Sequence, residues 1–252
     1  NGIPPGADDG YSANINLQFV SALQQAVEIF SHFNLETEAA KYSALERHVR
    51  SAVVERCYNP ERKMIAETPG QKIYSQHTNI WAILTYAIPE LAQEALMHRI
   101  LTEADLIQTT IYYKFYLFRA LQQCGMGDHY LTMLDPWWKM LDNGMSTFGE
   151  RDGVMRSECH AWSSSPCFDF LHTVAGIYPL EPGFKSVAVY PNFGNLLKLE
   201  VDFPHPNGEM KVSLRKTRKN RVQGTIILPE NTTGEFHWRR QIVQLHEGVN
   251  KL

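Results

Sequence analysis

The chain has 252 residues, of which 44% are hydrophobic and 20% charged, and its formal net charge is -3. This composition is ordinary for a soluble globular protein with one or two domains, offers no basic face for nucleic acid and contains no apolar run long enough to span a membrane. The four cysteines include no Cys-x-x-Cys pair, so neither a zinc site nor a disulfide framework is expected.

The first two thirds of the chain show helical periodicity. After a loop rich in Pro, Gly and Asp, Ser12 is a suitable N-cap for a helix that ends near Asn34. A second helix is expected over residues 36–57, where Asn59-Pro60 ends it. Further helices are expected at about residues 75–87, 90–101, 110–124, 128–141 and 168–174. Short connections indicate antiparallel helix pairs, and these could form a compact bundle or half of a larger toroid.

From about residue 184 the pattern changes to short segments with a period of two, typical of strands. Strands are expected at residues 187–190, 197–201, 211–214 and 222–228, with Asn207-Gly208 as a tight-turn signal. The basic run at residues 215–221 falls at an expected hairpin turn, and we interpret it as solvated rather than as a binding patch. The fold class is therefore mainly α with an all-β C-terminal domain, divided into residues 1–180 and 181–252.

Residues 143–166 follow neither pattern. This segment collects three carboxylates, a histidine and a tryptophan: Glu150, Asp152, Glu158, His160 and Trp162. An aromatic ring and polar groups suit a sugar, which offers a CH face and hydroxyls, and glycoside hydrolysis needs two carboxyl groups. The composition by itself favours a plain surface loop with capping carboxylates over a sugar site.

Two stretches of this segment resemble the C-terminal part of the catalytic domain of bacterial α-L-rhamnosidases: residues 143–150 (NGMSTFGE) and residues 156–166 (RSECHAWSSSP), followed by 171–177 (LHTVAGI). Weaker similarities occur in the same order at residues 2–6, 22–26, 74–79 and 182–192, so that the resemblance covers essentially the whole chain. It implies the second half of an α/α toroid of the six-hairpin glycosidase type, followed by a small antiparallel β-sandwich. The implied reaction is inverting hydrolysis of terminal α-L-rhamnosides, with a rhamnose-containing oligosaccharide or glycoside as substrate and with no cofactor or metal.

The same resemblance assigns residues to roles. Glu150 matches the general base that activates water, His160 matches a substrate-contacting histidine, and Trp162 is expected to line the same pocket. Asp8 and Asp9 are candidates to contact the substrate from the first loop, although a plain solvated loop is the favoured interpretation. On chemistry alone Asp152 and Glu158 are rival bases, ranked below Glu150.

The sequence also departs from the family. The general acid of these enzymes lies in an Arg-Asp/Glu-rich motif ahead of a Trp-x-Gly-Asp segment, and neither is found here. We therefore expect the chain to start midway through the toroid, to be a poor or inactive catalyst alone, and to expose helix faces that the missing barrel half or self-association would cover. The alternative functions are a non-catalytic carbohydrate-binding or interaction module derived from such an enzyme, and a toroid glycosidase for another sugar.

Other polar and aromatic residues have simpler interpretations. Trp81 is expected in the core, and of the adjacent Trp137 and Trp138 one is expected in the core, because neighbours cannot share one helix face. Three further residues could face a barrel cavity, but hydrogen bonding at a helix end is the favoured interpretation: Gln76, His77 and Asn79.

Overall fold

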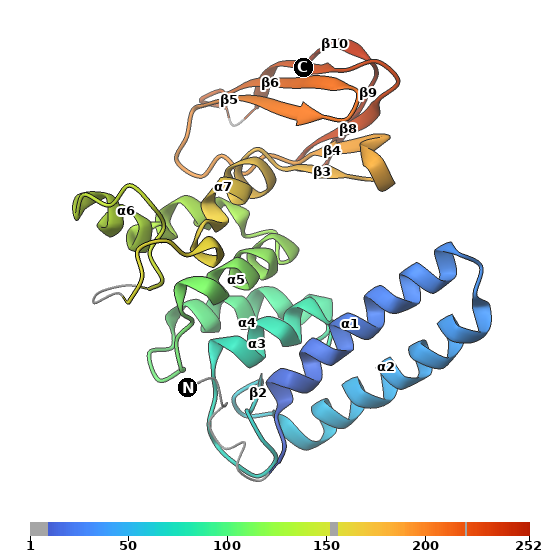
Figure 1. The fold of residues 1–252 in the computed structure, drawn as a ribbon, viewed down its shortest axis with the longest axis vertical. Helices are drawn as coiled ribbons and strands as arrows, with labels where there is room; N and C mark the ends of the chain where they lie inside the picture. Colours follow the sequence, from blue (N-terminus) through green and yellow to red (C-terminus); the bar gives the residue numbers. More distant parts are fainter. Residues whose placement is uncertain (1–9, 152–155, 220) are drawn as a thin grey trace. The chain divides into compact units, whose positions relative to one another are not determined.

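The computed structural model describes residues 10–151, 156–219 and 221–252, which divide into two compact units, Asn1–Met126 and Gly127–Leu252. The predicted class, mainly α with an all-β C-terminal region, is confirmed (Figure 1). The second unit holds the last helical segments together with the strands, whereas the sequence groups those segments with the preceding helices. The domain boundary near residue 180 stays a prediction.

The first unit begins with a hairpin of two long helices, α1 (Ala13–His32) and α2 (Glu36–Cys57), which lie side by side (Figure 1). The predicted N-cap is confirmed, because the Ser12 side chain accepts a hydrogen bond from Ile15 N at 3.2 Å. The chain reverses at Asn34, whose φ of 56° is a left-handed conformation that asparagine adopts more readily than most residues.

A two-stranded hairpin, β1 (Tyr58–Asn59) and β2 (Met64–Ile65), leads to three shorter helices, α3 (Gln76–Leu84), α4 (Glu90–Thr102) and α5 (Ile111–Gln123). The burial predicted for the third helix is confirmed, since α3 packs against α1, α4 and α5 and nearly all its side chains are buried. This unit therefore has one core centred on α3.

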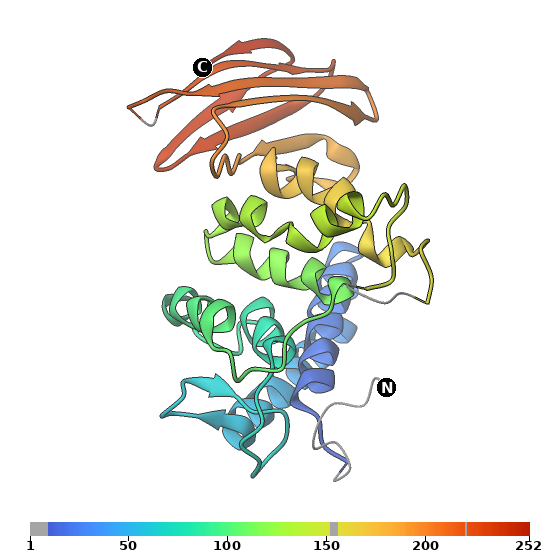
Figure 2. The same ribbon diagram turned by 90° about the vertical axis from the view of Figure 1, so that its left-hand side faces the viewer.

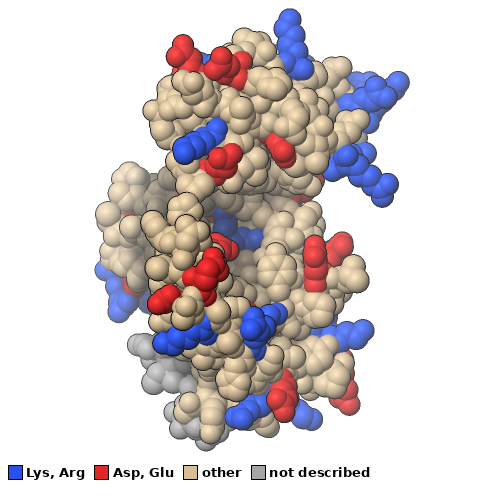
Figure 3. Space-filling view, turned by 90° about the vertical axis from the view of Figure 1, so that its right-hand side faces the viewer, with Lys and Arg blue, Asp and Glu red and all other residues tan. Residues whose placement is uncertain are grey.

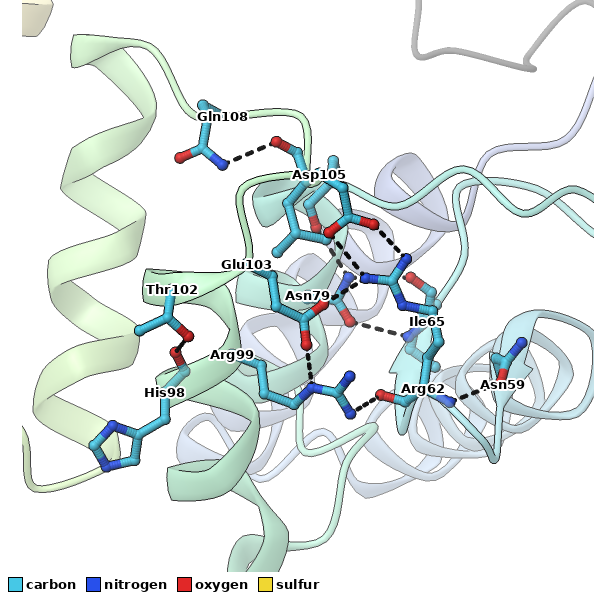
Figure 4. Close-up of polar contacts among 12 residues, drawn as sticks. Asn59, Arg62, Ile65, Asn79, His98, Arg99, Thr102, Glu103, Asp105 and Gln108 are labelled. Atoms are coloured by element: carbon cyan, nitrogen blue, oxygen red, sulfur yellow. Dashed lines mark hydrogen bonds and ion pairs between the residues drawn. The ribbon is translucent and has the colours of Figure 1, made fainter.

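A polar network joins the β1–β2 hairpin to the end of α4 (Figure 4). The Arg62 guanidinium donates to Glu103 and, at 2.8 Å, to Asp105, while Arg99 donates to Glu103 and to the Arg62 carbonyl oxygen. Because much of this network is open to solvent, it fixes the geometry of the connection more than it stabilises the fold.

The helical segments of the second unit are short. The helix expected at residues 128–141 is a 3₁₀ segment, Gly127–Met133, followed by α6 (Asp135–Asp142), which has proline in its first turn. Proline lacks the backbone N–H that would continue a preceding helix, so the break falls before it. The helix expected at residues 168–174 is α7 (Ser165–Asp169), which runs into a π-helical turn, Phe170–Val174.

The strands of the second unit form two four-stranded sheets, of order β10-β7-β6-β5 and β3-β4-β8-β9 in the described part of the chain (Figure 2). All pairs are antiparallel except β4 with β8, which run parallel. The bounds are β3 Ile177–Pro179, β4 Ser186–Val189, β5 Lys198–His205, β6 Gly208–Lys216, β7 Val222–Leu228, β8 Thr233–Trp238, β9 Gln241–Leu245 and β10 Gly248–Lys251.

Alternating side chains of the strands make the core of this region. Along β6, Met210, Val212 and Leu214 are buried and their neighbours are exposed, as expected for a sheet with one covered face. Gly176, just before β3, has a φ of 69°, and a Cβ there would lie 1.9 Å from the Tyr190 carbonyl oxygen. Only glycine fits this close approach of two backbone segments.

The surface carries both signs of charge over the face shown in Figure 3. The basic run falls at the β6–β7 connection, as predicted, with Arg215 and Lys216 at the end of β6 and Arg221 just before β7. Among the described helices, none combines the length and the apolar character needed to cross a bilayer.

Candidate functional site

The loop that carries Glu150 is closed at its neck by backbone hydrogen bonds. His160 N donates to Phe148 O at 2.7 Å, and Glu150 N donates to Ser157 O at 3.0 Å. Residues 152–155, which fall between these two bonds in the sequence, lie outside the described residues. The two bonds bring Glu150 and His160 to the same end of the loop, although ten positions separate them in the sequence.

The Glu150 carboxylate is almost enclosed, with 8% of the side chain exposed, and it is held by one arginine. Arg156 Nε donates to Oε2 at 3.1 Å, and Arg156 Nη2 donates to Oε1. These hydrogen bonds lower the pKa of Glu150 below its ordinary value against the opposing effect of burial, and the positive fields of Arg156, His160 and Arg151 add to the lowering. Glu150 is therefore ionised at neutral pH.

His160 and Trp162 lie beside this carboxylate. Their ring centroids are 4.5 Å apart at an interplanar angle of 44°, and Trp162 Nε1 donates to the Glu150 carbonyl oxygen at 3.2 Å. Trp162 is 45% exposed, while His160 Nδ1 is buried and has no hydrogen-bond partner among the described residues. The structure thus brings together three of the predicted site residues, and their roles in binding and catalysis stay predictions.

Beneath the loop lies a residue that the sequence did not single out. Ser163 is fully buried, and its hydroxyl lies 2.5 Å from Gly149 O and 2.9 Å from His160 O. Its own carbonyl oxygen accepts a hydrogen bond from Trp137 Nε1 at 2.6 Å. Trp137 is therefore the core member of the tryptophan pair, as predicted for one of the two. No signal in a run of three serines distinguishes Ser163 from its neighbours.

The remaining candidates divide into two groups. Asp8, Asp9 and Asp152 lie outside the described residues. Glu158 is exposed, and its carbonyl oxygen accepts a hydrogen bond from the Thr147 hydroxyl. Among the described residues, no group of three His, Cys, Asp or Glu side chains is arranged to hold a metal ion.

The polar residues of α3 mainly serve the fold. Gln76 Nε2 donates to Ile100 O at 2.8 Å, and the Asn79 amide both accepts from Ile65 N at 2.9 Å and donates to Ile65 O at 3.1 Å (Figure 4). The hydrogen-bonding interpretation is confirmed for these two residues. Trp81 is buried as predicted, and its indole N–H donates to the Tyr113 hydroxyl at 2.8 Å.

Two titratable groups of the first unit are shifted towards their neutral forms. Burial lowers the pKa of His77 from 6.5 to about 4, and the ring packs edge-on against Tyr113 with centroids 4.3 Å apart. Burial also raises the pKa of Glu67, whose side chain accepts hydrogen bonds from the Ser75 hydroxyl and, at 2.6 Å, from the Thr78 hydroxyl. Glu67 was not predicted from the sequence, because nothing in its polar connecting segment marks a buried carboxyl group.

An apolar cavity of about 340 Å³ is lined by α6, by residues 145–148 of the loop segment and by α7 with the turn that follows it. Trp137, Trp138, Leu141, Phe148 and Phe170 are among its lining residues, whereas Glu150, His160 and Trp162 are not. The cavity is therefore distinct from the polar cluster, although Phe148 belongs to the same loop.

Comparison with known proteins gives a family for the C-terminal region and a fold for nearly the whole chain. Residues 176–251 match the family described as the bacterial alpha-L-rhamnosidase C-terminal domain. No match is found among curated proteins. The resemblance inferred from the sequence is confirmed at this level.

Several solved structures have the same fold. A GH78 family rhamnosidase of Bacillus sp. GL1 matches with a TM-score of 0.83 and 19% identity over 91% of this chain and 26% of its own. An α-L-rhamnosidase from Aspergillus terreus matches with a TM-score of 0.77 and 17% identity over 92% of this chain and 29% of its own. The Streptomyces avermitilis α-L-rhamnosidase, solved in complex with L-rhamnose, matches with a TM-score of 0.74 and 19% identity over 93% of this chain and 26% of its own. The chain spans less than a third of the length of these relatives.

Proposed function

Since residues 176–251 belong to the bacterial α-L-rhamnosidase C-terminal domain family and the chain has the fold of these enzymes, we propose that it carries the water-activating part of an inverting α-L-rhamnosidase. In this proposal Glu150 is the general base and His160 and Trp162 contact the sugar. The observation that carries it is the cluster itself: an ionised carboxylate, nearly enclosed, beside an exposed indole and an imidazole with an unpartnered buried nitrogen.

The proposed chemistry needs a base that is charged before substrate binds. The Glu150 carboxylate takes a proton from a water molecule, whose oxygen attacks the anomeric carbon while an acid on the opposite side of the sugar protonates the departing oxygen. The lowered pKa of Glu150 keeps it in the form that accepts a proton. The acid partner is not among the residues that we assign, and for this reason we expect weak hydrolysis by the chain alone.

The proposed substrate class is the terminal α-L-rhamnosides. The exposed ring of Trp162 offers a flat apolar surface for the CH face of a sugar, and imidazole can hydrogen-bond a hydroxyl. The complex of the Streptomyces avermitilis relative with L-rhamnose supports this choice of sugar.

The direct test measures hydrolysis of p-nitrophenyl α-L-rhamnoside by the chain and by the longer protein that contains it, each with and without Glu150→Gln. General base catalysis contributes roughly 10²–10⁴-fold to a rate, so we expect Glu150→Gln to reduce hydrolysis by about that factor. An unchanged rate in a folded Glu150→Gln protein would rule out Glu150 as the base.

The second candidate function is a non-catalytic carbohydrate-binding or interaction module, which the lack of a recognisable general-acid motif favours. Binding of L-rhamnose and of D-glucose, followed by NMR shifts of the Trp162 indole N–H, separates the candidates. Rhamnose binding without hydrolysis in either protein supports the module, and preference for glucose over rhamnose indicates a site for another sugar.

The proposal also includes a partner for exposed apolar side chains of α1, either the missing barrel half or a second copy of the chain. Ile15, Phe19, Ile29 and Phe33 are each about half or more exposed in the described chain, and contiguous apolar surface commonly marks an interface. Light scattering over a range of concentrations tests self-association, and Phe33→Ser is the variant expected to weaken it.

A further inference from the structure

Arg156 donates two hydrogen bonds to the Glu150 carboxylate, from Nε and Nη2, which lie on the same edge of the guanidinium group. We infer that Arg156 is a positioning residue for Glu150: it fixes the orientation of the carboxylate and keeps it charged, while each oxygen retains an acceptor site for water. The inference rests on the proposed function of Glu150 as general base.

The geometry of the pair is set by the neck of the loop. Ser157, the residue after Arg156, accepts the backbone hydrogen bond from Glu150 N at 3.0 Å. The main chain thus holds Glu150 and Arg156 next to each other, and the side chains add a second, two-pronged connection at the same place. A planar guanidinium can make two parallel hydrogen bonds to a carboxylate, which the single ammonium group of lysine cannot reproduce.

The pair leaves Glu150 able to act. An ionised carboxylate has about four acceptor sites on its two oxygens, and Arg156 uses one on each. One site per oxygen remains to receive a proton from water. Orientation matters here because a base acts only from within hydrogen-bond reach of the proton that it abstracts.

The exposed fractions of the Glu150 and Arg156 side chains explain why Glu150 stays ionised although it is enclosed. Glu150 is 8% exposed, and burial of this kind raises a carboxyl pKa, whereas Arg156 is 78% exposed and keeps most of its hydration. Arg156 therefore stabilises the carboxylate without itself being buried, which avoids the main cost of a buried ion pair. The fields of His160 and Arg151 lower the pKa of Glu150 as well, by less than Arg156 does, and Asp152 lies outside the described residues.

Replacement of Arg156 should therefore change when Glu150 titrates as well as how it is oriented. In Arg156→Gln, burial acts without the opposing ion pair, and the midpoint of Glu150 titration should rise by at least about one pH unit, since a close opposite charge shifts a carboxyl pKa by about 1–3 units. Arg156→Lys keeps the positive charge but cannot make the two parallel hydrogen bonds. The midpoint of Glu150 titration in this variant should therefore lie between those of the unmodified chain and Arg156→Gln.

The first experiment follows the side-chain carboxyl of Glu150 by NMR over a pH series in the full chain labelled with carbon-13 glutamate, with Glu150→Gln to assign the signal. The proteins compared are the unmodified chain, Arg156→Gln, Arg156→Lys and Arg151→Gln. Arg151 is the matched control, because it lies next to Glu150 in the sequence and its field is the smallest of the effects on the pKa of Glu150, so its loss should shift the midpoint less. A midpoint unmoved in a folded Arg156→Gln chain, or moved equally by Arg151→Gln, would overturn the inference.

The second experiment measures the pH profile of kcat/KM for p-nitrophenyl α-L-rhamnoside with the same variants in the longer protein. The acid limb should move to higher pH in Arg156→Gln and kcat should fall, with KM little changed. A rise in KM with an unmoved acid limb would instead make Arg156 a sugar-binding residue and overturn its positioning role.

The two experiments separate the possible failures. If Glu150→Gln reduces hydrolysis but the midpoint of Glu150 titration does not move in Arg156→Gln, only the inference about Arg156 is wrong. If the titration shifts as expected but Glu150→Gln leaves hydrolysis unchanged, the proposed function of Glu150 is wrong, and a catalytic role for Arg156 falls with it.

Discussion

The pKa values of enclosed titratable groups are shifted towards the neutral form in the first unit and towards the charged form in the second. In the first unit, burial moves both Glu67 and His77 towards their neutral forms, and the donors around Glu67 are the uncharged hydroxyls of Ser75 and Thr78. In the second unit, the donors to Glu150 belong to an arginine and keep the carboxyl group charged. The charge of an enclosed carboxyl group thus depends on its donors as well as on burial: burial is the main cause of the shift at Glu67, and the hydrogen bonds from Arg156 are the main cause at Glu150.

This difference separates a structural role from a catalytic one. A buried carboxyl group surrounded by hydroxyls can serve the fold in its protonated form, whereas a general base at neutral pH must be ionised. Four variants or groups of variants test the contrast, beginning with the largest expected effect.

His77 should make the largest contribution to the pH dependence of stability. Its pKa is about 4 in the folded chain against 6.5 ordinarily, so the unfolded chain binds a proton more readily between these values. Stability is fully present above pH 6.5, falls as the pH falls, and is reduced by about 3 kcal/mol near pH 4, at 1.4 kcal/mol per pKa unit.

Urea unfolding at several pH values, with His77→Gln as the reference, isolates this contribution because all other groups are shared. The difference between the two proteins should change by about 3 kcal/mol from pH 7 to pH 4. A constant difference would mean that His77 titrates normally and is not held neutral by burial.

Replacement of Glu67 should change the free energy of unfolding by less than the titration of His77 does. Glu67→Ala leaves the buried hydroxyls of Ser75 and Thr78 without their acceptor and should lower the free energy of unfolding by about 2 kcal/mol, whereas Glu67→Gln keeps an acceptor and should cost about 1 kcal/mol. Denaturant unfolding at pH 7 measures both.

The pH dependence at Glu67 and Glu150 runs in opposite directions. Glu67 has a raised pKa, so the stability that it contributes is greatest below 4.5 and declines as the pH rises through its folded value. Glu150 has a lowered pKa, so its contribution is present above 4.5 and is lost as the pH falls through its folded value. The free energies of unfolding of Glu67→Gln and Glu150→Gln, each compared with that of the unmodified chain over this pH range, should therefore change in opposite directions. A change of the same sign in both variants would contradict the contrast between the two carboxyl groups.

Sequence-based prediction was accurate for the longest helix and uneven for the short strands, since β4, of four residues, was expected whereas the longer β8 and β9 were not. The bounds of α2, Glu36–Cys57, were predicted to the residue, because over many turns a helical period and an Asn-Pro stop leave few alternatives. The strands β3, β8, β9 and β10 were missed, and the parallel pairing of β4 with β8 was not expected, since six residues or fewer carry little periodicity and pairing depends on tertiary contacts.

The candidate site was predictable only through resemblance. Composition alone favoured a surface loop, whereas the two loop motifs selected Glu150, His160 and Trp162, which the structure brings together. Arg156 lies in one of these motifs, but no role was predicted for it, because its partner is determined by the closure of the loop between Glu150 and Ser157. Side-chain pairing of this kind depends on backbone geometry that no spacing rule encodes.

The hydrogen bond from Trp137 to Ser163, beneath the Glu150 loop, should contribute about as much to the free energy of unfolding as one ordinary buried hydrogen bond. Trp137→Phe removes the indole N–H that donates to Ser163 O and leaves that carbonyl oxygen buried without this donor, at a cost of about 1–2 kcal/mol. Chemical unfolding measures the cost. The matched variant Trp138→Phe, on the exposed neighbour, should change stability little, and an equal cost for both would show that the hydrogen bond to Ser163 contributes nothing specific.

The smallest effect is expected at the other arginine–carboxylate cluster, Arg62 with Glu103 and Asp105 (Figure 4). Asp105 is 64% exposed, so water can replace the arginine as its partner, and the less exposed Glu103 keeps its hydrogen bond from Arg99. Arg62→Gln should therefore cost less than about 1 kcal/mol. The cost should fall further in 1 M salt, where charges are screened beyond about 3 Å.

Thermal unfolding of Arg62→Gln at low and high salt measures this effect. Arg156 is itself 78% exposed, but it donates two hydrogen bonds to a carboxylate that is only 8% exposed. Salt should therefore reduce the shift in Glu150 titration caused by Arg156→Gln less than it reduces the cost of Arg62→Gln. If salt reduced both effects alike, the enclosure of Glu150 would have no electrostatic consequence, and the contrast between the structural arginine–carboxylate cluster and the enclosed base would fail.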